Sequence, residues 1–178
     1  TEVSQVLAAQ ALWQRKPKTM RVNIDGILPP GVTAKDVVLS IIAKISAAGA
    51  IGHVIEYAGS TIRAMSMEAR LTICNMSIEA GARAGMIAPD EITFEYLKDK
   101  PYTPKGDAWV EVLEKWKQLP SDAEAIFDTE VYLNAEEMAP MVTWGTSPEN
   151  SLPIHALVPD PLTVEDPDRR ADMDRALK

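Results

Sequence analysis

The sequence predicts an α/β fold in which helices cover both faces of a sheet, a three-layer α/β/α sandwich. Segments with helical and strand-like periodicity alternate along the first 60 residues. The strand-like segments are short and rich in β-branched residues, as is typical of buried strands. A length of 178 residues and a hydrophobic content of 46% suit one domain with an extension. We expect the domain over residues 1–140 and a proline-rich linker over residues 141–178.

The first elements follow from local signals. Thr1 can cap a first helix that ends before residue 17. Apolar and polar residues alternate over residues 20–24, which predicts a half-buried strand. Thr33 and Asp36 have the spacing of a capping box, so a helix follows and ends near residue 49. Residues 53–57 then predict a second short strand.

A central helix is predicted over residues 67–84. Ser66 is a good N-cap, and Gly85 can adopt the left-handed conformation that ends a helix. At 3.6 residues per turn, one apolar face is expected to form the core contact. Its residues are Met67, Leu71, Cys74, Ile78 and Ala82.

Asn75 and Glu79 lie beside that apolar face. They are four residues apart, so their side chains point the same way from successive turns. An amide and a carboxylate at the margin of a buried face can bind and deprotonate a hydroxylated ligand. The alternative is that Glu79 forms an ordinary surface ion pair with Arg83, which is also four residues away.

The second half of the chain contains further helices and one strand. Asp90 caps a helix, and Trp109 and Trp116 belong to an amphipathic helix in which the two rings are expected to pack rather than to bind a ligand. Residues 126–133 predict a strand. From residue 140 onward prolines recur, and the charged last stretch forms a short helix or stays a partly disordered linker.

Residues 73–82 read Ile-Cys-Asn-Met-Ser-Ile-Glu-Ala-Gly-Ala, which resembles the Cys-Asn-Met-x-x-Glu-x-Gly-Ala signature of the aconitase superfamily. The continuation through Phe94, the Pro-x-x-Pro-Lys-Gly run at residues 101–106 and the Val-Thr-Trp-Gly-Thr-Ser-Pro run at residues 142–148 are similar to one branch of it. That branch is the large subunit, or large region, of 3-isopropylmalate dehydratases. The resemblance covers nearly the whole chain and implies an aconitase-like middle domain.

The resemblance also implies a chemistry. Members of the branch isomerise 2-isopropylmalate and 3-isopropylmalate in leucine biosynthesis by dehydration and rehydration, and a [4Fe–4S] cluster serves as Lewis acid. By position, Asn75 would hydrogen-bond the reacting hydroxyl, and Glu79 would help to move its proton. The cluster cysteines, the upstream histidine and aspartate segments and the substrate-binding arginines would lie outside residues 1–178. We therefore expect no cluster in this chain alone and no activity without the remaining domains or a small subunit.

Composition excludes several classes of partner. The net charge of −8 argues against nucleic acid and against anionic membranes, and no apolar run is long enough to span a bilayer. The start of the chain lacks a signal-peptide pattern, and a single cysteine fits a reducing compartment, so we expect a cytoplasmic protein. One cysteine and two separated histidines predict no metal site within the chain.

Three functional readings remain open. They are a 3-isopropylmalate dehydratase, a sister hydro-lyase such as homoaconitase or aconitase, and a non-enzymatic α/β module with an incidental Asn75 and Glu79. Glu56 matches a family glutamate but equally suits a carboxylate with a structural partner, and the role of His53 is open. The Thr146–Ser147 turn either approaches a ligand or is a tight structural turn.

Overall fold

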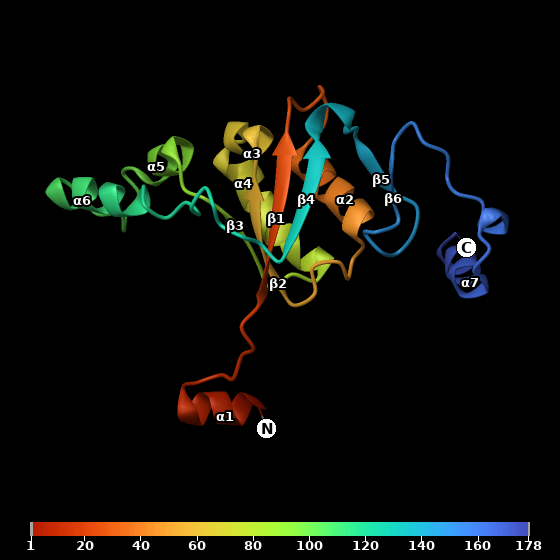
Figure 1. The fold of residues 1–178 in the computed structure, drawn as a ribbon, viewed down its shortest axis with the longest axis horizontal. Coiled ribbons are helices and arrows are strands. Elements are labelled where there is room, and N and C mark those ends of the chain that lie inside the picture. The colour runs from red at the N-terminus through yellow and green to blue at the C-terminus, as the bar shows by residue number, and fades with distance from the viewer. Residues whose placement is uncertain (1, 178) are drawn as a thin grey trace.

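A computed structural model describes residues 2–177 and is built around a parallel sheet. The four strands lie in the order β3-β2-β1-β4, and every neighbouring pair runs parallel (Figure 1). Their bounds are β1 Lys18–Asp25, β2 His53–Ala58, β3 Ala84–Ile87 and β4 Thr129–Asn134. The predicted strands are thus confirmed at three places, and β3 is a strand that the sequence did not indicate.

Helices connect and flank these strands. They are α1 Glu2–Ala9, α2 Ala34–Ile45, α3 Ser60–Ala64, α4 Met67–Met76, α5 Glu91–Leu97, α6 Asp107–Trp116 and α7 Pro167–Ala176. Single 3₁₀ turns lie at η1 Ser77–Ala80, η2 Ala135–Glu137 and η3 Pro161–Thr163. The N-terminal helix ends seven residues earlier than expected, and its predicted cap, Thr1, lies outside the described residues. None of the described helices is long and apolar enough to cross a membrane.

The core lies between the sheet and the helices on one of its faces. Val22, Ile24 and Ile55 point to that face and are fully buried against α2 and α4, which also supply Val37, Ile42 and Ile73. Burying each such side chain contributes about 1.5–3 kcal/mol. The α/β class and the parallel sheet flanked by helices are therefore confirmed.

The opposite face of the sheet is largely open. Residues that alternate with the core positions, among them Glu130 and Tyr132 on β4 and Met86 on β3, are exposed. Figure 1 shows α5 and α6 projecting away from the sheet rather than covering this face. Within residues 2–177 no second helical layer covers this face, although a three-layer sandwich was expected. The alternation of apolar and polar residues along β1 and β4 accounts for this, since one-sided burial requires only one apolar face.

The central helix is shorter than predicted and presents a different face to the core. α4 ends at Met76, and the chain continues as one 3₁₀ turn that Gly81 closes at a φ of +80°. Leu71 and Ile78, expected in the core, are 51% and 71% exposed. The buried face instead carries Ile73, Ser77 and Arg70.

Arg70 explains that rotation of the helix. Its guanidinium is 2% exposed and donates to both carboxylate oxygens of Asp90, at 2.6 and 2.7 Å, and to the carbonyl of Arg63 at 2.8 Å. Burial raises the pKa of Asp90, but hydrogen bonds from Arg70 and from the α5 backbone outweigh it and leave that pKa below its usual value. A buried arginine, paired with a half-buried aspartate, therefore occupies a core position that an apolar pattern cannot reveal.

The first part of the proline-rich segment packs on the domain. Strand β5 (Met141–Thr143) pairs antiparallel with β6 (Ser151–Pro153), and both contact α2. The backbone N–H of Met141 donates to Asp36 on α2, and Glu149 accepts from the N–H of Ala47 at the other end of that helix. The β5–β6 connection is thereby held along the side of α2. The division into a domain over residues 1–140 and a linker over residues 141–178 stays a prediction.

Candidate functional site

The candidate site is a pocket of about 600 Å³ between α2, the end of α4 and the β5–β6 connection. Glu79, one of the two predicted site residues, lies in its wall together with Met76. The first turn of α2 contributes Lys35, and the β5–β6 connection contributes Thr146 and Ser147. The pocket therefore brings the carboxylate of a predicted site residue together with two hydroxyls whose role the sequence left open.

Asn75 and Glu79 are both exposed. They come from the last turn of α4 and from η1, and within the described residues no hydrogen bond or ion pair engages either side chain. Glu79 lines the pocket, whereas Asn75 is not among the lining residues. The structure thus leaves both groups free for a ligand but brings only Glu79 into this cavity.

Arg83 does not act as the surface partner of Glu79. The helix ends before residue 83, so the four-residue spacing no longer places the two side chains on one helix face. The Arg83 guanidinium instead donates to the side-chain oxygen of Gln14 at 3.1 Å and to the carbonyl of Arg15 at 3.3 Å. The ordinary ion pair considered for Glu79 is therefore replaced by contacts with the N-terminal segment.

The hydroxyl-bearing turn is firmly held by its backbone. The N–H of Trp144 donates to the carbonyl of Asn150, and the N–H of Asn150 donates to the carbonyl of Ser147, each at 2.9 Å. A Cβ on Gly145 would lie 2.5 Å from the side-chain amide of Asn150, so a larger residue would require that side chain to move. The backbone of the turn therefore has a structural role. The hydroxyls of Thr146 and Ser147 form no hydrogen bond to any described residue.

Asp36 fixes the wall that faces this turn. Its carboxylate accepts from the N–H and the hydroxyl of Thr33, at 2.7 and 2.6 Å, and from the N–H of Met141 at 2.7 Å. The predicted capping box is confirmed, and the same carboxylate also anchors β5. Burial alone would raise the pKa of Asp36, but these hydrogen bonds outweigh it and lower the pKa. Asp36 is therefore an ionised structural group.

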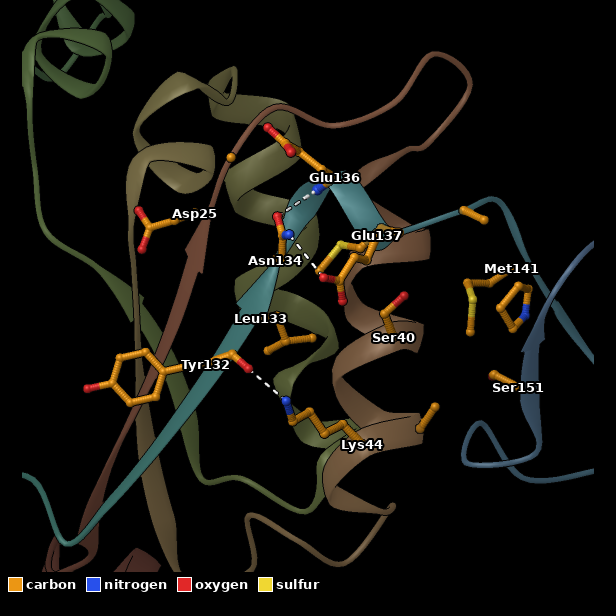
Figure 2. A pocket seen from close by; sticks show the side chains of 15 residues that line it. Asp25, Ser40, Lys44, Tyr132, Leu133, Asn134, Glu136, Glu137, Met141 and Ser151 are labelled. Atoms are coloured by element: carbon orange, nitrogen blue, oxygen red, sulfur yellow. Dashed lines mark hydrogen bonds between the residues drawn. The ribbon is translucent and has the colours of Figure 1, made fainter.

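A larger cavity, of about 870 Å³, lies where β1 and β4 end, as Figure 2 shows. Several of its polar groups form hydrogen bonds within the fold. The Lys44 ammonium donates to the carbonyl of Tyr132 at 2.7 Å, and Asn134 joins the side chain of Glu137 to the backbone of Glu136 (Figure 2). Because these groups satisfy one another, the smaller pocket beside Glu79 is the better candidate for a polar ligand.

The two other residues left open have local partners. Glu56 lies on the open face of the sheet, where Ser121 donates to it at 2.5 Å and the Arg21 guanidinium lies 3.5 Å away. The Nδ1 atom of His53 lies 3.0 Å from the carbonyl of Ile51 in the preceding turn. Both arrangements are those of structural groups.

The described residues do not fit an iron–sulfur cluster. Across residues 2–177, no three His, Cys, Asp or Glu side chains group closely enough to hold a metal ion. Burial raises the pKa of the lone thiol, Cys74, which disfavours the thiolate that a metal ligand requires. Any cluster would need ligands from other polypeptide.

Lys35 and Thr143 are pocket residues that the sequence did not single out. Lys35 directly precedes the capping aspartate on the first turn of α2. No sequence pattern indicated that the β5–β6 connection would fold back onto α2, because the contact spans more than 100 residues.

The parallel sheet, the flanking helices and a free carboxylate on a pocket define an α/β domain with a candidate site for a polar ligand. A family comparison specifies the class further. The model of the aconitase family (aconitate hydratase) matches residues 1–178. The chain belongs to the aconitase family, and its general chemistry is that of a hydro-lyase.

Proposed function

We propose that the chain is the central domain of a 3-isopropylmalate dehydratase, which interconverts 2-isopropylmalate and 3-isopropylmalate by dehydration and rehydration. The observation that carries the proposal is the state of Glu79: an exposed carboxylate, free of partners among the described residues, beside a pocket with a cation and hydroxyls. The motif at residues 73–82 and the runs at 101–106 and 142–148 support this branch of the family.

In this proposal the chain positions a hydroxyl group and moves its proton. The Glu79 carboxylate accepts a hydrogen bond from the reacting hydroxyl and exchanges a proton with it. The Asn75 amide donates to an oxygen of the same substrate from the preceding turn. The [4Fe–4S] cluster that polarises this hydroxyl in family members would be held by other domains or by a partner subunit. The chain alone would then be inactive, and we place the whole enzyme in the cytoplasm.

The test uses the holoenzyme that contains this chain, with its cluster loaded. Removing a positioned acid–base group typically costs a factor of about 10²–10⁴ in rate, so Glu79→Gln should lower kcat by that order. Asn75→Ala should lower kcat as well, and the visible absorbance of the cluster should be unchanged in both. Glu95→Gln, an exposed glutamate on α5 outside this pocket, is the matched control and should retain full activity.

Two alternatives give different results in the same assay. Comparing kcat/KM for 2-isopropylmalate, homoaconitate and citrate separates this branch from a homoaconitase or an aconitase. A preference for either of the latter substrates would move the assignment to a sister hydro-lyase. Full activity in both Asn75→Ala and Glu79→Gln would instead indicate a non-catalytic module.

A further inference from the structure

We propose that the pocket beside Glu79 holds one carboxylate of a hydroxy-dicarboxylate substrate, through the ammonium of Lys35 and the hydroxyls of Thr146 and Ser147. The inference rests on the proposed function, because it takes Glu79 as the group that meets the substrate hydroxyl. It assigns substrate-binding residues within this chain, in addition to any that other domains supply.

The first support is the kind of groups that meet there. One cation, one anion and three hydroxyls line the pocket without a hydrogen bond or ion pair to any described residue. They are Lys35, Glu79, Thr143, Thr146 and Ser147. A carboxylate accepts from an ammonium and from hydroxyls, and such charge-assisted hydrogen bonds are the strong ones. Free donors gathered in a concave site, beside one unpartnered carboxylate, fit an anionic ligand that also carries a hydroxyl. The other carboxylate in the lining, Asp36, is already engaged by Thr33 and by the N–H of Met141.

The second support is that the pocket is preorganised. Asp36 ties β5 to the first turn of α2, directly beside Lys35, and Glu149 ties the far end of the same connection to Ala47. The backbone hydrogen bonds of residues 144–150 fix the position of the two hydroxyls. Ligand groups held on a braced scaffold lose little conformational entropy on binding. The backbone of the turn is thus held in place, while the hydroxyls of Thr146 and Ser147 form no hydrogen bond to any described residue.

The third support is the apolar part of the wall. Met76 and Val142 line the same pocket, and Val142 is 43% exposed although its neighbour Met141 is tied to Asp36 on α2. A carboxylate at Lys35 would therefore leave room for an aliphatic group against Met76 and Val142. A branched alkyl substituent on the hydroxy-dicarboxylate matches this mixture of polar and apolar surface.

The test measures binding and turnover separately in the cluster-loaded holoenzyme. Losing a hydrogen-bonded charge partner costs about ten- to a hundredfold in affinity. Lys35→Gln should therefore raise KM for the substrate, and the Kd of malate measured by calorimetry, by about that factor, with kcat changed much less. Thr146→Ala with Ser147→Ala should raise both constants by a smaller factor. Lys105→Gln, an exposed lysine outside the pocket, is the matched control.

Lys35→Arg separates binding from a structural role. Restored malate binding in Lys35→Arg supports the proposal, because the charge and its hydrogen bonds return. If Lys35→Gln lowers the melting temperature and Lys35→Arg restores neither binding nor KM, Lys35 is structural and the proposal is overturned. Unchanged malate affinity in Lys35→Gln, relative to Lys105→Gln, overturns it as well.

The readout also separates this inference from the proposed function. Weakened malate binding in Lys35→Gln, in an enzyme that does not turn over isopropylmalate, would retain the carboxylate site and reject the dehydratase assignment. Loss of isopropylmalate turnover in Glu79→Gln, with unchanged malate binding in Lys35→Gln, would retain the dehydratase assignment and reject the carboxylate site.

Discussion

Asp36 is the residue whose ionisation couples the helix α2 to the candidate pocket. Its folded pKa is lowered, so the ionised carboxylate stabilises the fold at pH values above its unfolded pKa. That contribution is lost as the pH falls through the folded pKa, where the carboxylate takes up a proton. Asp36→Asn keeps an acceptor for Met141 but turns an N–H₂ group toward the N–H of Thr33, which then lacks a partner.

We expect Asp36→Asn to lower the free energy of unfolding by about 1.5–3 kcal/mol, the contribution of hydrogen bonds to a charged acceptor. Urea unfolding at neutral pH and at pH 3 measures it, and the loss should shrink at the lower pH. Asp122→Asn, an exposed aspartate, is the control and should change little. Equal losses at both pH values would contradict a role for the ionised carboxylate.

At the scale of the element, Gly81 ends the η1 turn and redirects the chain into β3. Its φ of +80° disfavours any residue with a Cβ by about 1–2 kcal/mol. A Cβ there would also lie 2.6 Å from the Cγ1 atom of Ile51. Gly52 offers a matched comparison, because its φ is +77° and no atom lies within 4 Å of its added Cβ.

We expect Gly52→Ala to lower the free energy of unfolding by the backbone cost alone and Gly81→Ala to lower it by more. Ile51→Ala in the background of Gly81→Ala should remove most of the excess, because the other two close atoms, the carbonyl oxygen of Ala47 and the backbone nitrogen of Ile51, lie at 3.3 and 3.4 Å. Urea midpoints of the three variants measure these differences. If Gly81→Ala and Gly52→Ala lost the same stability, the contact with Ile51 would not contribute.

The helices and strands differ in whether local sequence signals predict them. β1 and β2 and the capping box of α2 were predictable because each depends on local alternation or on one hydrogen-bonding pair. The side of α4 that faces the core could not be predicted in this way. The residue that enters the core there is Arg70, whose partner Asp90 is 20 residues away. β3 was not predicted because Ala84 and Gly85 have low strand propensity. They form a strand only because they pair with β2. Within the candidate site Glu79 came from the motif, whereas Lys35 required the long-range contact between α2 and β5.

The whole molecule has one buried core and one open sheet face. On the open face, Tyr132 donates to Glu130 at 2.6 Å, Asn23 lies 3.4 Å from the same carboxylate, and the Arg21 guanidinium stacks over the ring of Phe127 at 5.2 Å. These contacts pair several of the polar side chains on this face with one another, without a covering helix. The energy that holds the fold therefore concentrates between the sheet and α2, α3 and α4, and the peripheral helices contribute less.

Helix α6 illustrates that difference. None of its residues is buried, and its main packing is the contact of Trp116 with Trp109, at 5.8 Å between ring centroids, and with Phe94 at 6.2 Å. Figure 1 shows α5 and α6, the helices that carry these rings, apart from the sheet. The aromatic pair is thus a packing contact, as expected from the sequence, but in a small satellite cluster rather than in the core.

We therefore expect opening free energies to differ across the molecule, as native-state hydrogen exchange measures them. Amides of β1 and β2 should exchange only on global unfolding, because both strands are paired on two sides and pack on the core. Amides of α6 should exchange through a local opening of much lower free energy, and Trp116→Ala should lower that value further without affecting β1. If α6 instead showed the protection of β1, and Trp116→Ala lowered both equally, the aromatic cluster would belong to the cooperative core.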